Sequence, residues 1–166
     1  MNTGKTLSCG TNPPAISMTD IPSDIMTKME RFCAWQERCE NDVRRKLTSF
    51  HLSESQEDAI VKSLRDNRFL DEERYVEMFV RGKVKAGWGK YKIVAALRAK
   101  GIPSELIGRC CSDISEEYYA DRLRNAVEKW RRSHPDEPGN SPKLVRHLLS
   151  KGYAMEEAMR VVKDKE

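Results

Sequence analysis

The sequence of 166 residues contains little of what marks membrane proteins or deeply cored enzymes. No run approaches the ~18 apolar residues that a membrane span needs, and residues 1–14 contain no apolar stretch of the signal-peptide type. We therefore expect a cytosolic protein. Aromatic residues make up only 7% of the chain and apolar residues 39%, below the roughly 45–50% of typical globular chains. This low apolar share argues against an α/β enzyme with one deep core.

Arrangements of residues that bind metals or perform catalysis are also missing. The five cysteines form no CxxC motif, and two of them are neighbours, which rarely pair, so the sequence predicts reduced thiols. The three histidines are scattered without the spacing of metal ligands. No Ser/His/Asp or Cys/His arrangement is recognisable, and the adjacent Glu116 and Glu117 point about 100° apart on a helix. We predict no metal site, no cofactor and no enzymatic activity.

Charged residues, by contrast, make up 34% of the chain, and apolar side chains recur with the helical period almost everywhere after residue 20. Capping residues, glycines and prolines between these segments predict nine helices. The predicted helices begin near Asp20 or Ser23, Asn41 or Asp42, Ser53, Asp71, Lys90, Pro103, Ser115, Pro142 and Met155. No segment alternates as a strand would, so the predicted fold class is all-α.

A short pattern recurs along the chain: a helix end, Lys-Gly, an apolar residue and another short helix. It occurs at Lys100-Gly101 and at Lys151-Gly152, and a degraded copy about fifty residues upstream has His51 at the glycine position. The pattern predicts three tandem three-helix repeats over residues 21–69, 70–113 and 114–166, after a disordered tail over residues 1–20. Units this small stabilise one another by stacking, so we expect an elongated, curved array with a concave face.

Acidic residues are absent from Met78 to Ser104, although the net charge of the whole chain is only +4. This stretch holds seven basic residues, Arg81, Lys83, Lys85, Lys90, Lys92, Arg98 and Lys100. We expect Arg81, Lys83 and Lys85 near one side of their helix. Lys90 and Lys92 should flank the exposed glycine turn, together with Trp88 and Tyr91. Basic groups next to aromatic side chains suit a phosphate backbone or an acidic protein groove. A second group of basic residues, over residues 122–132, is either solvent-exposed without a binding role or a contact with a partner.

The same central region carries a specific resemblance to a known family. The motifs are Phe69-Leu70-Asp71-Glu72-Glu73-Arg74-Tyr75-Val76, Phe79-Val80-Arg81 with Lys83, Gly87-Trp88-Gly89, Lys92-Ile93, Leu97 and Lys100-Gly101-Ile102. In order, residue type and spacing they resemble the core signature of the RecX regulatory proteins. Weaker flanking repeats extend the resemblance across residues 24–165. The sequence departs from the signature at Lys83, where Arg is commoner, at Gly82 inside a helix, and at His51.

The resemblance implies an all-α regulator of the recombinase RecA, without enzymatic activity of its own. Such a protein docks in the groove of the RecA filament on single-stranded DNA and inhibits the ATPase, strand exchange and coprotease activities of the filament. It thereby modulates recombination, DNA repair and the SOS response. We expect it to act as a monomer. Composition and spacing by themselves leave two other readings open, a helix-turn-helix DNA-binding protein and a helical-repeat scaffold for another protein.

The residues that carry these expectations fall into two groups. The predicted contacts to RecA or DNA are Arg74, Arg81, Lys83, Lys85, Trp88, Lys90, Lys92, Arg98 and Lys100. The predicted structural positions are Asp71, Tyr75, Gly89, Gly101 and Gly152, as helix caps, turns and core. The family's conserved positions match at Asp71, Arg74, Tyr75, Arg81, Gly89, Lys92 and Gly101.

Overall fold

A computed structural model describes residues 21–163, so the predicted tail over residues 1–20 lies outside the described residues. Within the described range the chain is helical and has no strand, which confirms the all-α prediction. The helices are α1 (Ser23–Trp35), α2 (Glu40–Leu47), α3 (Glu54–Asp66), α4 (Glu72–Lys85), α5 (Lys90–Arg98), α6 (Ser104–Ser112), α7 (Glu116–Ser133), α8 (Pro142–Ser150) and α9 (Met155–Lys163). No helix among them is long and apolar enough to cross a membrane.

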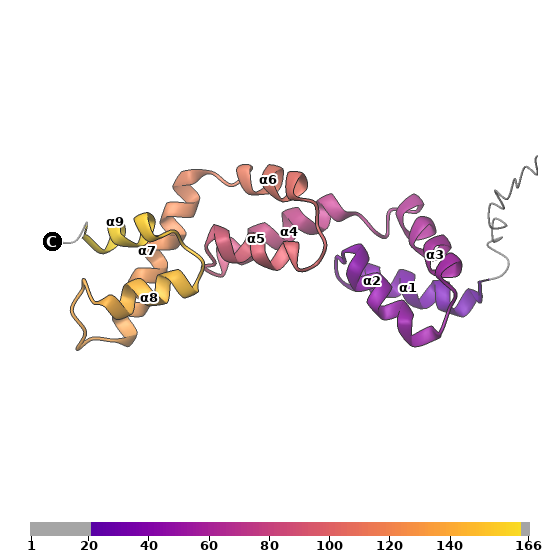
Figure 1. The fold of residues 1–166 in the computed structure, drawn as a ribbon, viewed down its shortest axis with the longest axis horizontal. Coiled ribbons are helices and arrows are strands. Elements are labelled where there is room, and N and C mark those ends of the chain that lie inside the picture. Colours follow the sequence, from indigo (N-terminus) through magenta and orange to yellow (C-terminus); the bar gives the residue numbers. More distant parts are fainter. Residues whose placement is uncertain (1–20, 164–166) are drawn as a thin grey trace, which may run out of the picture.

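The helices form a row of three units of three helices each (Figure 1). The first helix is the longest in the second and third units, whereas α1 and α3 of the first unit have 13 residues each. Each unit has a hydrophobic core of its own. The first core is built around Met29, Leu47 and Leu64, and the third around Leu144 and Leu148. The three-helix repeats expected from the sequence are therefore present, and we refer to α1–α3, α4–α6 and α7–α9 as the first, second and third repeats.

The turn between the second and third helix of each repeat has the same backbone conformation in all three copies. Gly101 and Gly152 have φ angles of +79° and +90°, and His51 has φ +53° at the corresponding place. A left-handed conformation is unusual for a residue with a side chain, although histidine adopts it more readily than most. The copy that looks degraded in the sequence has therefore kept the turn while losing the glycine.

Most helices begin where the capping residues indicate. Ser53 forms a capping box with Gln56 at the start of α3, and the side chains of Asp71 and Ser115 cap α4 and α7. Three expectations need correction. Pro22 precedes α1 and offers no side-chain cap, and Ser23 is the first residue of the helix, so Ser23 does not cap it; Asp20 lies outside the described residues. Helix α2 begins at Glu40, before the expected Asn41 or Asp42, and a 3₁₀ turn, Thr48–Phe50, follows it. The apolar pattern after Lys90 predicts a helix as far as Lys100, but α5 ends at Arg98.

Neighbouring repeats meet at two corresponding places, where the start of a second helix contacts the Lys-Gly turn of the next repeat. At the first junction, both carboxylate oxygens of Asp42 in α2 lie 2.8 Å from the Lys100 ammonium. Cys39 donates its thiol to Asp42 over 3.2 Å and packs into the core of the second repeat. The first junction therefore consists of side chains, with a buried carboxylate at its centre.

The second junction is made mainly by the backbone. The amide of Gly89 donates to the Lys151 carbonyl over 2.8 Å, and the amide of Tyr91 donates to the Gly152 carbonyl over 3.0 Å. A Cβ atom on Gly89 would lie 2.1 Å from the Gly152 carbonyl carbon, and one on Gly152 would lie 2.4 Å from the Lys92 Cβ. Only glycine at both places lets the two backbone segments approach this closely.

Candidate partner-binding surface

The side chains of Lys83 and Lys92 converge on Trp88. The Lys83 ammonium lies 4.7 Å and the Lys92 ammonium 4.6 Å from the centre of the Trp88 ring, and Lys83 also lies 5.1 Å from the Phe79 ring. An indole face attracts cations, and a partly desolvated pair of this kind contributes roughly 0.5–2 kcal/mol. We call Lys83, Trp88 and Lys92 the cationic cluster. It presents two fixed positive charges at the boundary of the second and third repeats.

Backbone geometry holds this cluster in place. Gly87, with φ +79°, ends the turn after α4, and the Trp88 amide donates to the Lys83 carbonyl over 2.9 Å. Lys92 also donates to the Ser150 carbonyl over 3.4 Å, which ties it to the end of α8. The cluster is thus built on the second junction, and side chains that are already held in place lose less conformational freedom when a partner binds.

One expectation about the basic face of α4 is wrong. Lys83 lies against Phe79 and Trp88, whereas the Arg81 guanidinium lies 3.9 Å from the Glu77 carboxylate on another side of the helix. At about 100° per residue, Lys83 is about 160° away from both Arg81 and Lys85. Arg81 and Lys85 are exposed and share a face, but they do not extend the cationic cluster.

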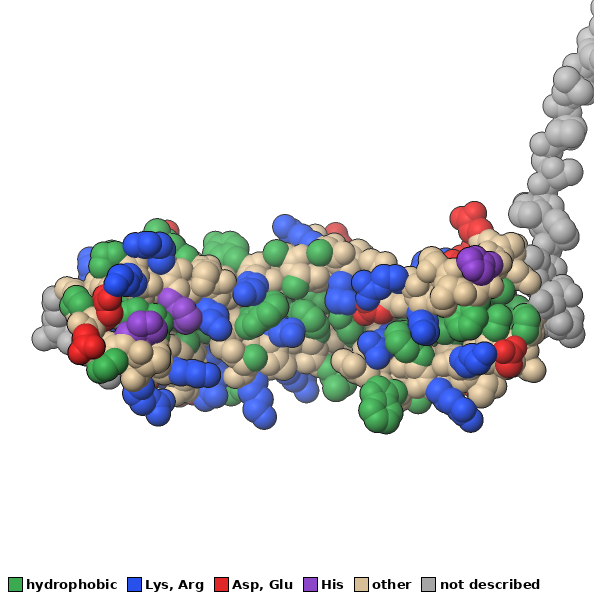
Figure 2. Space-filling model, turned by 90° about the horizontal axis from the view of Figure 1, so that it is seen from below, with side chains coloured by type: hydrophobic (Ala, Val, Ile, Leu, Met, Phe, Trp, Pro, Cys, Tyr) green, Lys and Arg blue, Asp and Glu red, His purple; other side chains and the backbone are tan. Residues whose placement is uncertain are grey.

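Lys90 and Arg98 lie on α5, and both are exposed. The Lys90 amide donates to the Tyr119 hydroxyl over 2.7 Å, and its ammonium lies 6.0 Å from the centre of that ring. Arg98 lines a groove together with the exposed Tyr91. On the face shown in Figure 2, basic side chains spread along the whole length of the molecule and predominate over acidic ones.

Two of the predicted contact residues, Arg74 and Lys100, are paired with carboxylates of the first repeat. Lys100 is held by Asp42 at the first junction. Burial by itself lowers the pKa of Lys100, but the hydrogen bond and charge of Asp42 act in the opposite direction. On balance the pKa of Lys100 is raised above its ordinary value, and the ammonium form is stabilised. Arg74 donates to Glu37 over 2.6 Å and to the Arg68 carbonyl over 3.2 Å, and the Glu37 carboxylate raises its pKa. Their contact with a partner stays a prediction.

The predicted structural residues lie where turns, caps and core require them. The Asp71 side chain accepts the amide of Arg74 over 3.0 Å, and Tyr75 is buried with its ring 5.9 Å from that of Phe79. Gly101 and Gly152 form the left-handed turns. The φ angle of Gly89, −80°, is accessible to any residue, so backbone conformation does not require a glycine there. Glycine is needed at this position because a Cβ atom would collide with the Gly152 backbone at the second junction.

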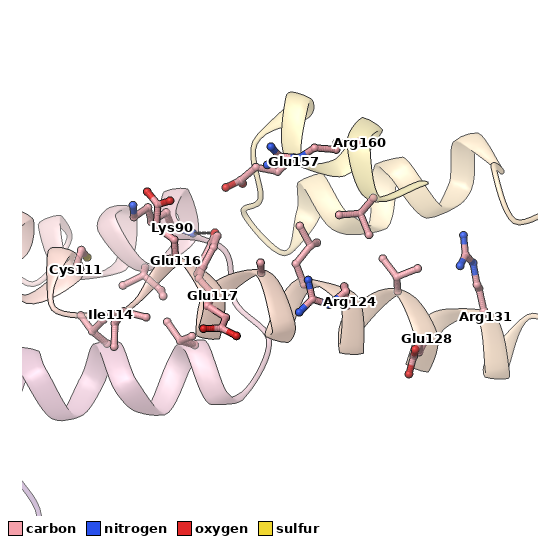
Figure 3. Close-up of a pocket in the computed structure, with 18 residues that line it drawn as sticks. Lys90, Cys111, Ile114, Glu116, Glu117, Arg124, Glu128, Arg131, Glu157 and Arg160 are labelled. Atoms are coloured by element: carbon pink, nitrogen blue, oxygen red, sulfur yellow. Dashed lines mark hydrogen bonds between the residues drawn. The ribbon is translucent and has the colours of Figure 1, made fainter. Parts of the chain in front are cut away.

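A cavity of about 620 Å³ lies between the second and third repeats. Figure 3 shows charged groups from Lys90, Arg124, Arg131, Glu157 and Arg160 around an apolar interior formed by α4, α7 and α9. Four basic and four acidic residues line it, so it selects no sign of charge. Within residues 21–163 no group of three or more histidine, cysteine or acidic side chains could hold a metal ion. Burial raises the pKa of the Cys33 thiol to about 11, which makes it unreactive.

The residues that sequence reasoning missed are the partners of predicted ones. Asp42, fifty residues before Lys92, occupies the same place in its repeat and carries the opposite charge. The repeat spacing was the signal that could have indicated Asp42 as a junction residue. Ser150 could not have been found, because it contributes a backbone carbonyl that any residue would supply.

Residues 71–109 match the family model described as RecX, second three-helix domain. The chain is similar to the regulatory protein RecX of Clostridium botulinum (strain Alaska E43 / Type E3), with 34% identity over 134 residues, covering 76% of this chain and 61% of that protein. It is also similar to the regulatory protein RecX of Salmonella heidelberg (strain SL476), with 22% identity over 147 residues, covering 82% of this chain and 89% of that protein. The chain thus spans about 61% of the length of the clostridial relatives.

Two solved structures share the fold. A crystal structure of regulatory protein RecX superposes with a TM-score of 0.75 at 24% identity, covering 86% of this chain and 73% of that one. A crystal structure of RecX from Lactobacillus salivarius superposes with a TM-score of 0.70 at 20% identity, covering 86% and 97%. At these identities the structures establish the arrangement of the helices.

Proposed function

Because the chain belongs to the RecX family, we propose that it is a regulatory protein that binds the RecA filament on single-stranded DNA. In this proposal it inhibits the ATPase, strand exchange and coprotease activities of RecA and so modulates recombination, DNA repair and the SOS response. It acts in the cytoplasm as a monomer and catalyses no reaction itself.

The observation that supports this proposal best is the cationic cluster on the second junction. Lys83 and Lys92 lie 4.7 and 4.6 Å from the centre of one indole ring, within a stretch of 27 residues, Met78–Ser104, that has no acidic side chain. A filament of protein on DNA presents phosphates and acidic side chains, both of which attract such a surface.

The elongated shape supports a filament as the partner. Three small cores in a row leave much of each helix at the surface, so one chain is long enough to reach more than one subunit of a filament (Figure 1). Binding across neighbouring RecA subunits inhibits the filament because it resists the rearrangement between subunits that accompanies ATP hydrolysis. The contact is electrostatic, and we expect it to weaken steeply as salt concentration rises.

The test is a titration of the chain into cognate RecA on single-stranded DNA, with ATP hydrolysis as the readout. We expect hydrolysis to fall at substoichiometric or near-stoichiometric amounts of the chain. The double variant Lys83→Glu/Lys92→Glu should lose most of this inhibition, and its helicity measured by circular dichroism should not change. A matched control is Arg31→Glu/Lys46→Glu, which makes the same change of charge at exposed positions of the first repeat.

Three outcomes would contradict the proposal or part of it. Unchanged ATP hydrolysis and strand exchange across the whole titration would exclude RecA inhibition. Full inhibition by Lys83→Glu/Lys92→Glu, with the control also active, would move the contact away from the cationic cluster. Tight, sequence-dependent binding to duplex DNA without RecA would instead favour a DNA-binding protein.

A further inference from the structure

A groove runs between α5 and α6 of the second repeat, away from the cationic cluster. Its volume is about 520 Å³, and Tyr91, Val94 and Arg98 line one side of it. Val94 lies only about 60° from Tyr91 around α5, whereas Lys92 lies about 160° from Val94. The groove and the cationic cluster therefore face different directions. We call this feature the α5–α6 groove.

The first repeat closes the corresponding place with its own side chains. Fifty residues before Val94 and Gly108 stand Arg44 and Asp58, whose guanidinium and carboxylate lie 2.8 Å apart across α2 and α3. Fifty-one residues after Gly108 stands Met159. In the second repeat, a Cβ atom added to Gly108 would meet nothing within 4 Å. The second repeat has thus left open a surface that the first repeat closes with an ion pair.

The composition of the α5–α6 groove indicates what fits it. Its interior is apolar, formed by Val94, Ile107 and Cys111. The large aromatic side chain of Tyr91 is 68% exposed beside it, and tyrosine is a frequent anchor of protein interfaces. Gly108 lets another backbone come close. These features suit a helix with small apolar residues along one face.

Charge selects the partner further. Lys90 and Arg98 line the groove and lie about 12 Å apart along the axis of α5. The carboxylate that lines it, Glu157, already accepts the Ala154 amide over 2.8 Å. The two cations outnumber this one carboxylate, and they lie at the spacing of two helical turns. The larger cavity next to it offers no such preference, because its charges balance.

We propose that the α5–α6 groove is a docking site for a helical protein segment that carries two acidic side chains two turns apart, with small apolar residues between them. The acidic side chains pair with Lys90 and Arg98, and the apolar face covers Val94 and Tyr91. The groove shares Lys90 and Arg98 with the predicted contacts to RecA or DNA, but it lies on another face of α5 than the cationic cluster. Its test reads peptide binding directly, so its outcome is separate from that of the RecA titration.

The probe is a fluorescein-labelled synthetic peptide of alanine and leucine with two glutamates two helical turns apart. A control peptide has lysine at both glutamate positions. Fluorescence anisotropy with the full chain should show binding of the glutamate peptide only. Arg98→Glu should weaken this binding by about tenfold or more, whereas Arg31→Glu, the same change at an exposed position of α1, should leave it unchanged.

A second variant tests the shape of the groove independently of Arg98. Val94→Arg with Gly108→Asp transplants the ion pair that closes the first repeat, and it should abolish peptide binding while helicity is retained. If that variant unfolds, Tyr91→Ala takes its place, since the Tyr91 side chain is exposed. Equal binding of the two peptides overturns the proposal. It is also overturned if the glutamate peptide still binds to Arg98→Glu and to the variant that tests the shape of the groove, either Val94→Arg/Gly108→Asp or Tyr91→Ala. An oligothymidylate that binds through Arg98, while the glutamate peptide does not bind, overturns it as well.

Discussion

The two junctions between repeats lie at corresponding places but are held by different chemistry. At the first junction the Asp42 carboxylate meets the Lys100 ammonium, and the side chains of both are largely buried, 10% and 30% exposed. At the second junction the amides of Gly89 and Tyr91 bind carbonyl groups of the Lys151-Gly152 turn. Lys100 and Lys151 both precede the left-handed residue of their turn, yet only Lys100 pairs with the preceding repeat through its side chain.

Because of this difference, the two junctions tolerate different substitutions and different conditions. A backbone contact depends on the absence of side chains, so it is sensitive to any added Cβ and insensitive to charge. An ion pair depends on two particular side chains and on their ionisation. We infer that the second and third repeats form the more rigid pair, and that conditions which neutralise Asp42 loosen the first repeat.

The largest effect is expected from Gly89→Ala at the second junction. The new Cβ would lie 2.1 Å from the Gly152 carbonyl carbon, so the two backbones must separate and both hydrogen bonds weaken. We expect the free energy of unfolding to fall by about 3 kcal/mol or more, measured by chemical denaturation. Gly82→Ala is the matched control. Its Cβ meets nothing within 4 Å inside α4, and it should raise stability by ~0.5–1 kcal/mol.

Asp42→Asn should have the next largest effect, at the first junction. Lys100 would then remain partly buried beside an amide that cannot neutralise it, which we expect to cost about 2 kcal/mol of unfolding free energy. A double-mutant cycle with Lys100→Met isolates the interaction between the two side chains. If the two single substitutions add without coupling, the carboxylate and the ammonium do not hold the junction.

Acid should weaken the first junction. Burial alone raises the pKa of Asp42, but hydrogen bonds from Lys100 and Cys39 and the charge of Arg45 lower it more, so the pKa stays below its ordinary value. A carboxyl whose pKa is lowered by folding stabilises the folded chain above pH about 4, and this stabilisation is lost as pH falls through the lower, folded value.

The comparison between wild type and Asp42→Asn measures this effect. The stability difference between them should be largest at neutral pH and should shrink as pH falls below about 4. Hydrogen exchange at the Gly89 and Tyr91 amides, corrected for intrinsic rates, should show no loss of protection that tracks the titration of Asp42. A difference that stays constant down to pH about 2 would exclude Asp42 as the titrating group.

The smallest effect is expected from Arg74→Gln, which removes a second ion pair near the first junction. Arg74 and Glu37 are 2.6 Å apart, but both side chains are partly exposed, so we expect a loss of about 0.5–1 kcal/mol. Arg109→Gln, which breaks a more exposed pair with Glu73, should change stability less. If Arg74→Gln also leaves RecA inhibition intact, Arg74 stabilises the folded chain and does not contact RecA.

Much of the fold could be predicted because local signals carry it. The helical period, the caps at Ser53, Asp71 and Ser115, and the two Lys-Gly turns lie within short stretches of sequence. The position of Lys83 was predicted wrongly although the error was also local. Residues 81, 83 and 85 look like one basic run in the sequence, but residue 83 lies about 160° around the helix from both 81 and 85.

The candidate surface could be predicted only in part. The acid-free stretch and Trp88 indicate a cationic surface, and the structure brings Lys83 and Lys92 onto that ring. Lys100 belongs to the same stretch, yet its charge is satisfied by Asp42, 58 residues away. Nothing near Lys100 in the sequence distinguishes it from the exposed lysines, because the distinction arises from packing between repeats.

The sequence by itself therefore determined the helices, the repeat with its left-handed turns, the family signature and the excess of positive charge at the centre. These properties follow from propensities and periodicities over a few residues. Only the tertiary structure decided which charges stay at the surface, that Gly89 is needed for close approach and not for its own φ angle, and that the second repeat keeps an open groove. Those properties depend on contacts between segments some fifty residues apart, where the neighbouring repeat and not the local chain supplies the partner.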